Sequence, residues 1–150
     1  MNTRKHLFIL AIGVLGCVSF TRGEVAYVYR VNSTIQTWHQ AFESCYNLAW
    51  GSKLAIFDIE DGLDAQENIK ALLPNIDPSM CYYIGVHDLF YEGHYLDIQG
   101  RELRYTKWST GQPDNLEEKQ NCAAVNAELK MFDTECDRPN CFALCMEPDT

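Results

Sequence analysis

The alternation of apolar and polar residues predicts a helix early in the chain. Residues 37–40, Thr-Trp-His-Gln, have the form of a capping box, and Gly51 is expected to end the helix. Between these signals the apolar residues recur at i, i+3 and i+4 spacing and define one face: Trp38, Ala41, Phe42, Cys45 and Leu48. We expect Trp38 and Phe42 to pack in the core.

A second helix is predicted from Asp58 to about residue 73. Asp58 is a suitable N-cap, and Glu60 and Asp61 lie in the first turn, where the helix dipole favours acidic residues. Pro74 and Pro78 are expected to end this helix. Its apolar residues are roughly in phase: Ile59, Leu63, Ile69 and Leu72.

Several short β-favouring runs surround these helices. They cover residues 25–29, 53–56, 81–86, 122–127, 130–133 and 142–145. Residues 87–110 are polar, rich in aromatics and lack a helical period, so we expect a long loop region, which in a compact domain usually carries function. The pattern predicts one α+β domain over residues 24–150, with two helices and short antiparallel strands.

The first 23 residues have the pattern of a secretory signal peptide. Arg4, Lys5 and His6 form a basic start, residues 7–18 are apolar, and residues 21–23 make a cleavage site before Glu24. A membrane anchor is the alternative, but about 12 apolar residues are too few to span a bilayer as a helix. We therefore expect a secreted, extracellular protein with no membrane anchor.

Removal of this segment changes the cysteine count and the charge. It leaves nine basic and 21 acidic residues, a net charge of −12, which argues against nucleic acid as a partner. Six cysteines remain, and an even number in a secreted chain indicates disulfides, although six cysteines permit 15 pairings. Asn32-Ser33-Thr34 is a sequon, so Asn32 is a candidate glycosylation site.

Oxygen-bearing side chains gather late in the chain. Gln112-Pro113-Asp114 forms a proline-containing loop, and Asp133 follows in a predicted strand. Carboxylate and carbonyl oxygens suit a hard cation such as calcium, which in turn can bind paired sugar hydroxyls. A zinc site of Cys136, Cys141 and Cys145 is the alternative use of the late cysteines, but it lacks a histidine partner and does not fit an oxidising compartment.

With these elements in order, the chain resembles the C-type lectin-like domain family. The resemblance rests on Thr37-Trp38 through Cys45 and residues 53–56, and on Tyr82-Tyr83-Ile84-Gly85 where the family usually has Trp-Ile-Gly. It continues through Asp88, Glu92-Gly93, Trp108, residues 111–115 and Cys122, and ends with Asp133, Cys136 and Phe142-Ala-Leu-Cys145.

This resemblance implies a disulfide-stabilised fold and a sugar-binding calcium site. It implies the pairs Cys45–Cys145 and Cys122–Cys136, and we expect Cys81 and Cys141, both at strand starts, to form a third bridge. The Gln112–Pro113 bond is expected to be cis, and the order Gln112, Asp114 resembles the galactose-preferring class. By the same resemblance, calcium is held by Gln112, Asp114, Gln120 and Asp133. Sugar is bound by Gln112, Asp114 and Asp133.

Two positions depart from the family's calcium site. Gln120 stands where the family usually has Glu, and Phe132 where it has Asn, so the ligand set carries a charge of −2 and its affinity is expected to be weaker. An auxiliary calcium site is implied by Asp88 and Glu92, with Asn115 and Asn121 at positions that are usually acidic. The alternative is that Asp88 and Glu92 are ordinary solvated loop carboxylates.

Three functions are compatible with these residues. The first is a secreted calcium-dependent lectin of the galactose type that recognises extracellular or microbial glycans, a role in innate immunity. The second is a calcium-independent module that binds a protein partner and keeps the fold with a degenerate ion site. The third, an enzyme using Asp114 and Asp133 or His87 and His94, lacks a nucleophile–base–orienter arrangement.

His87 and His94 are expected to be exposed. Tyr91, Tyr95 and Tyr105 are expected to be free to stack on a ligand, and so is Trp108 unless it packs in the core. Oligomeric state stays open, since no coiled-coil or collagen-like stalk is present to supply multivalency.

Overall fold

The computed structural model describes residues 27–57 and 62–149, without side-chain detail for residues 62–65 and 68. The predicted signal peptide and the Asp58 cap, with Ile59, Glu60 and Asp61, lie outside the described residues. Leu63 lies among those without side-chain detail.

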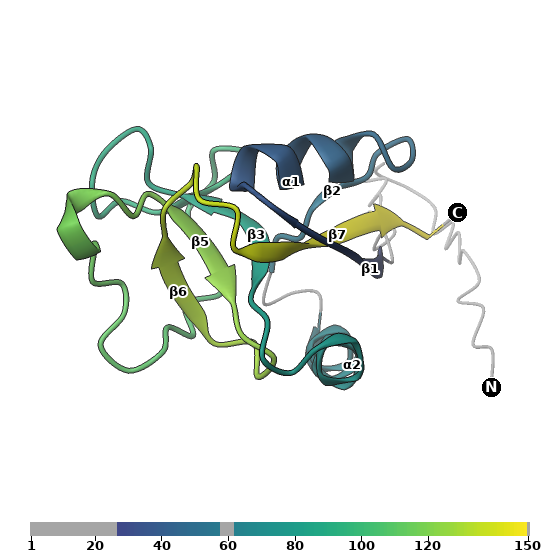
Figure 1. Cartoon of the computed structure of the whole chain (residues 1–150). Helices are drawn as coiled ribbons and strands as arrows, with labels where there is room; N and C mark the ends of the chain where they lie inside the picture. The colour runs from purple at the N-terminus through teal and green to yellow at the C-terminus, as the bar shows by residue number, and fades with distance from the viewer. Residues whose placement is uncertain (1–26, 58–61, 150) are drawn as a thin grey trace, which may run out of the picture.

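The strands join in one sheet, and the two helices lie on opposite sides of it (Figure 1). The sheet order is β1-β7-β3-β5-β6, with β2 paired to β7 and β4 to β3. The predicted α+β class is confirmed, and the named strands pair antiparallel as expected except for β3 and β7, which pair in parallel. The elements are β1 (Tyr27–Gln36), α1 (Trp38–Tyr46), β2 (Lys53–Leu54), α2 (Gly62–Ile76), β3 (Tyr82–His87), β4 (Leu96–Asp97), η2 (Leu116–Glu118), β5 (Cys122–Val125), β6 (Met131–Thr134) and β7 (Cys141–Pro148).

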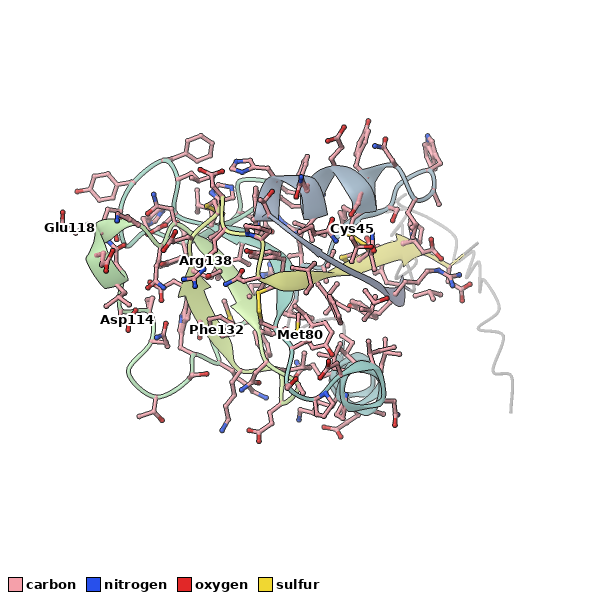
Figure 2. All side chains as sticks on the ribbon, in the orientation of Figure 1. Cys45, Met80, Asp114, Glu118, Phe132 and Arg138 are labelled. Atoms are coloured by element: carbon pink, nitrogen blue, oxygen red, sulfur yellow. A yellow bond between two sulfur atoms is a disulfide. The ribbon has the colours of Figure 1, made fainter. Side chains whose placement is uncertain are left out.

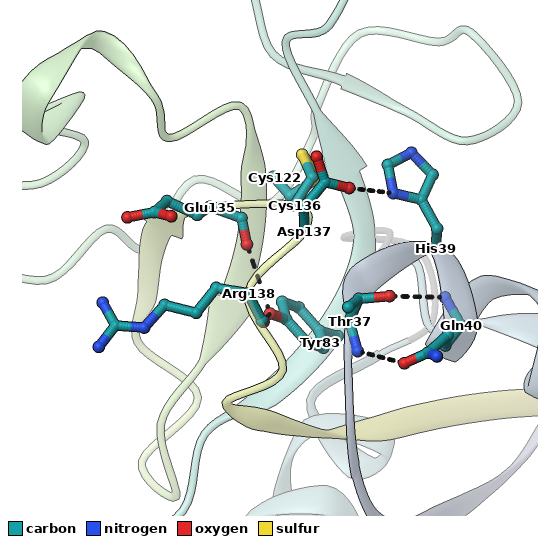
Figure 3. Close-up of polar contacts among 9 residues, drawn as sticks. All are labelled: Thr37, His39, Gln40, Tyr83, Cys122, Glu135, Cys136, Asp137 and Arg138. Carbon is teal, nitrogen blue, oxygen red and sulfur yellow. Dashed lines mark hydrogen bonds and ion pairs between the residues drawn. A yellow bond between two sulfur atoms is a disulfide. The ribbon is translucent and has the colours of Figure 1, made fainter.

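Helix α1 begins at the predicted capping box. The Thr37 hydroxyl accepts from the Gln40 amide at 3.2 Å, and the Gln40 side chain accepts from the Thr37 amide at 3.0 Å (Figure 3). Trp38 is buried, and its indole N–H donates to the Ile84 carbonyl at 2.8 Å. The expectation that Phe42 packs in the core is wrong: its ring stacks on Trp38 but stays substantially exposed, because it lies at the edge of the buried face.

Two predicted boundaries are corrected by tertiary contacts. Strand β1 extends to Gln36 because β7 pairs along it, with an irregularity between Asn32 and Gln36. Helix α2 continues past Pro74 to Ile76, since proline removes only its own N–H and the next turn closes through the Asp77 amide and the Leu73 carbonyl at 3.2 Å.

Strand β3 is buried on both faces and divides the core into two clusters. Tyr82, Ile84 and Val86 face the cluster that contains Ile69 and Leu73 of α2. Tyr83 faces the other cluster, which contains Trp38, Ala41 and Cys45 of α1. The six cysteines form the three predicted disulfides: Cys45–Cys145, Cys81–Cys141 and Cys122–Cys136. This pairing excludes the zinc alternative.

Candidate loop site

The candidate site is built around the carboxylate of Asp133 on β6. This side chain is 1% exposed, and it accepts from two successive amides of the facing loop, Asp114 at 3.1 Å and Asn115 at 2.6 Å. The Tyr95 hydroxyl donates to the same carboxylate at 3.4 Å. Asp133 therefore joins the loop to the sheet through charge-assisted hydrogen bonds, the stronger kind in proteins.

The loop bends sharply at the predicted cis bond. The Gln112–Pro113 bond is cis, as expected, and the Gln112 side-chain oxygen accepts from the Asp133 amide at 3.2 Å. Asn115 adopts a left-handed conformation, with φ of 42°, which asparagine tolerates better than most residues. These contacts hold Gln112 and Asp114, the two neighbours of the proline, next to β6. Figure 2 labels Asp114 on this loop and Phe132 on β6.

Gln120 joins the same network from the far side of the loop. Its side-chain oxygen accepts from the Leu116 amide at 2.7 Å, and its own amide donates to the Asn115 side chain at 3.1 Å. The structure thus brings together all four residues predicted from the sequence. Three of their four side chains already accept hydrogen bonds from the chain, and the exposed Asp114 carboxylate does not.

The remaining oxygen lone pairs are compatible with a weakly bound cation. A carboxylate offers about four acceptor positions and an amide oxygen two, so Gln112, Gln120 and Asp133 each keep one beyond the bonds described above. Within the described residues no cluster of three or more His, Cys, Asp or Glu side chains is placed to hold a metal ion. Any ion here would therefore depend on amide oxygens and two carboxylates, as the substitutions at Gln120 and Phe132 imply.

A second group of oxygens lies beside this network, at the predicted auxiliary site. Asp88 is 2% exposed; one of its oxygens accepts from the Gly93 amide at 2.8 Å, while the other is buried without a hydrogen-bond partner. The Asn121 side-chain oxygen is buried without a partner too, and the Asn121 carbonyl accepts from the Asp88 amide at 3.1 Å. Asp88 is therefore not a solvated loop carboxylate.

The electrostatics of this second group favour a cation. Partial desolvation, followed by the negative charges of Asp88, Asp133 and Glu118, raises the pKa of Glu92, and a hydrogen bond with Asn115 opposes the rise. Burial and the charges of Asp88, Asp133 and Glu92 also raise the pKa of Tyr95. Because unpartnered buried oxygens are costly, Asp88 and Asn121 supply the chemistry that the predicted auxiliary ion requires.

Several aromatic and histidine expectations are corrected by the fold. Tyr95 and Tyr105 are buried and cannot stack on a ligand, since Tyr105 donates to the Leu129 carbonyl and Tyr95 to Asp133. Trp108 is partly buried and packs against Tyr95, whereas Tyr91 is exposed. His94 is exposed as predicted. His87 is not a loop residue: it ends β3, and burial lowers its pKa against the opposing charges of Asp88 and Asp97.

The connection from β6 to β7 is tethered beside the site. The Tyr83 hydroxyl lies within hydrogen-bond distance of the carbonyls of Arg138, at 2.7 Å, and Glu135, at 3.5 Å (Figure 3). The Trp38 amide donates to the Cys136 carbonyl at 2.9 Å, and the Cys122–Cys136 disulfide lies at this position. Sequence reasoning missed both Tyr83 and Tyr95 as positioning residues, because their partners lie far away in the chain and no spacing signals them.

The chain belongs to the C-type lectin domain family. The family model for the lectin C-type domain matches residues 34–147. The chain is 36% identical over 75 residues to a mannose-binding protein of Gallus gallus, a match that covers 50% of this chain and 29% of that protein. It is 29% identical over 114 residues to perlucin of Haliotis laevigata, covering 70% of this chain and 72% of perlucin. The match thus spans less than a third of the chicken protein.

Solved structures confirm the fold. The C-type lectin CEL-I from Cucumaria echinata superposes with a TM-score of 0.71 and 23% identity, covering 83% of this chain and 91% of that chain. The cow carbohydrate-recognition domain of CD23, crystallised with an oligosaccharide, gives a TM-score of 0.71 and 22% identity, with 83% and 90% covered. C-type lectins are carbohydrate-binding proteins and not enzymes, which removes the enzymatic alternative.

Proposed function

We propose that this protein is a secreted lectin that binds glycans of the galactose type with the help of calcium. The observation that supports this most directly is the organisation of the loop by Asp133, which holds the Gln112–Asn115 segment in a fixed shape on β6. A polar loop that is ordered before a ligand arrives loses less entropy on binding. Gln112, Asp114 and Asp133 are the residues proposed to bind sugar.

The same loop explains how the chain would recognise a polyol. Asp114 is an exposed carboxylate and accepts hydroxyl donors, while the partly exposed Gln112 side chain has an amide group that donates to a hydroxyl oxygen. Calcium, when bound, would supply a hard Lewis acid for paired hydroxyls. We place its principal ligands at Gln112, Asp114, Gln120 and Asp133, and an auxiliary ion at Asp88, Glu92 and Asn115 with Asn121.

The test is binding of the purified protein to immobilised galactose. We expect retention in millimolar calcium and release by a chelator, with mannose as the competing sugar that fails to elute it. Asp114→Ala should abolish retention without loss of folding, since Asp114 is exposed. Glu117→Gln is the matched control, because Glu117 lies on the same loop and pairs with Lys119 at 3.0 Å, away from the network of Asp133.

Binding to galactose that persists in chelator would contradict the role of calcium. Equal elution by mannose and galactose would contradict the galactose preference. Loss of retention in both Asp114→Ala and Glu117→Gln would show that charge near the loop matters and not the proposed contact.

A second candidate function is a calcium-independent module that binds a protein. Asp133, Gln112 and Gln120 accept backbone amides, so hydrogen bonds within the chain itself hold this loop. Exposed apolar side chains also flank it: Leu89, Phe90, Tyr91 and Leu116. If calorimetry with millimolar calcium gave neither heat nor a rise in melting temperature, this second function would replace the first.

Secretion and glycosylation belong to the same proposal. In the described part of the chain no helix is long and apolar enough to cross a bilayer. Asn32 lies on edge strand β1 where the pairing becomes irregular, and Ser33 and Thr34 are exposed there, as an acceptor site requires. Release into culture medium, and a loss of apparent mass on glycosidase treatment that is absent in Asn32→Gln, would test both.

A further inference from the structure

The outer surface of α1 is the least charged part of this acidic protein. Glu43 is the single formal charge in residues 31–52, whereas charged residues make up 22% of the whole chain. Three aromatic side chains follow one another at intervals of four residues along this surface. Phe42 is 40% exposed, Tyr46 68% and Trp50 95%.

These three residues and the exposed Leu48, all between residues 42 and 50, make up the surface that we name the α1 face. Ile35 of β1 is not part of this face, because it lines a separate shallow groove with Thr34, Gln36, Gln40, Glu43, Ser44 and Asn47. Strand β1 ends the sheet order and has no further strand on its outer side among the described elements. Aromatic enrichment with loss of charge distinguishes the centres of protein interfaces from ordinary surface.

We infer that the α1 face binds a second copy of this chain and forms a symmetric dimer. The net charge of the protein favours a second copy as the partner at this face. The full chain carries a net charge of −9, and −12 without the predicted signal peptide, so two copies repel one another over most of their surfaces. A surface nearly free of charge is where that repulsion is smallest. A charged partner, in contrast, would find almost no complementary group on this face.

The available area fits a weak dimer. An aromatic side chain can bury 150–250 Å², so this face offers about 500 Å² per copy, or about 1,000 Å² in total. That area is near the lower limit for a specific interface, so we expect the association to be weak.

The position of the face leaves both loop sites accessible. The turn between α1 and β2, where Trp50 lies, and the loops next to η2 are at opposite ends of the molecule (Figure 1). A dimer through the α1 face would therefore present two loop sites from one particle. This inference does not depend on the proposed sugar or on calcium, because it concerns a different surface.

The experiment is sedimentation equilibrium of the full secreted chain over about 1–500 µM, in chelator, with and without the Asn32 glycan. We expect a monomer–dimer equilibrium, and Tyr46→Ala and Trp50→Ala should each raise the dissociation constant by roughly ten- to a hundredfold. Phe90→Ala and Tyr91→Ala are the matched controls, since these aromatics are 81% and 75% exposed on the loop side and should leave the equilibrium unchanged.

A charge-pair experiment tests the symmetry. In a two-fold interface the same surface of both copies takes part, and we place Tyr46, the middle residue of the aromatic series, next to the axis, where it meets its own copy. Tyr46→Glu and Tyr46→Lys should each be monomeric alone and should form a mixed dimer when combined. A wild-type chain that stays monomeric over the whole range would overturn the inference. Dimerisation that depends on Phe90 and Tyr91, or that resists Tyr46→Ala and Trp50→Ala, would also overturn it.

Discussion

Residues 31–52 and residues 88–121 have nearly opposite chemistry, although most residues of both ranges lie outside the sheet. The first region carries one formal charge, buries Trp38 and Cys45, and is joined to β7 by the Cys45–Cys145 disulfide. The second contains seven acidic residues and is organised by buried carboxylates at its base, Asp88, Asp97 and Asp133. Apolar burial and disulfides therefore hold the body, and charge-assisted hydrogen bonds hold the loops. We expect stability and ligand binding to be separable by mutation.

The largest effect on this comparison is expected from the body. Cys81–Cys141 closes a loop with a sequence separation of 60, so Cys81→Ser with Cys141→Ser should lower the free energy of unfolding by about 4 kcal/mol in the chain-entropy model. Urea unfolding without added oxidant or reductant, so that the other two disulfides stay intact, measures this loss. At urea concentrations below the unfolding midpoint, the affinity for the ligand should be unchanged. A loss of affinity together with the loss of stability would show that the body and the loops are not independent.

Next in size is the removal of the carboxylate that organises the loop. Asp133→Ala leaves the amides of Asp114 and Asn115 without acceptors, and we expect a loss of about 3 kcal/mol in the free energy of unfolding. Asp114→Ala, at an exposed position, should change it by less than about 0.5 kcal/mol. Equal losses in urea unfolding would contradict the assignment of Asp133 as the central acceptor.

The same contrast explains what sequence reasoning could reach. The capping box, the apolar spacing at i, i+3 and i+4 and the short β runs are local signals, and they predicted α1, the class of fold and the strands other than β4, which lies in the predicted loop. The family resemblance added the pairs Cys45–Cys145 and Cys122–Cys136 and the four loop residues, and the third pair was expected from the two remaining cysteines at strand starts. It could not supply the hydrogen bond from Tyr95 to Asp133, nor the burial of His87, because these depend on how β3, β4 and β6 pack.

Strand β1 and helix α2 show a second limit. Asn32 has little strand propensity, but β1 runs through it because Asn32 pairs with Ala143 of β7 and the pairing resumes at Gln36 with Cys141. Pro74 is a reliable stop signal only where the next turn has no other support. In α2, Leu73 is fully buried and accepts from both Asp77 and Tyr82, so the helix continues.

A smaller effect on stability is expected from Asp88→Asn, which distinguishes the auxiliary site around Asp88 from the loop site around Asp133. Asp88→Asn removes a buried charge whose one oxygen has no partner, so we expect unfolding in chelator to change by less than about 1 kcal/mol. In calcium at 100 times the dissociation constant, the wild type should gain about 2.7 kcal/mol, and the variant should lose most of that gain. Thermal unfolding with and without calcium measures both quantities. If the Asp88→Asn variant kept the full stabilisation by calcium, the stabilising ion would be bound by Gln112, Asp114, Gln120 and Asp133 instead.

The smallest effect is expected at Glu92. Desolvation and the charges of Asp88, Asp133 and Glu118 raise its pKa in the folded state, so the ionised form is disfavoured by folding. The resulting loss of stability is complete above the folded pKa and disappears below the unfolded one. In chelator at pH 7, Glu92→Gln should therefore raise the melting temperature slightly, and the difference from wild type should vanish as the pH falls below the ordinary range of a glutamate. Glu128→Gln, an exposed change on the turn between β5 and β6, is the control for the removal of one acidic group. A lower melting temperature for Glu92→Gln at pH 7 would show that Glu92 has a favourable partner and that its surroundings are not a place for a cation.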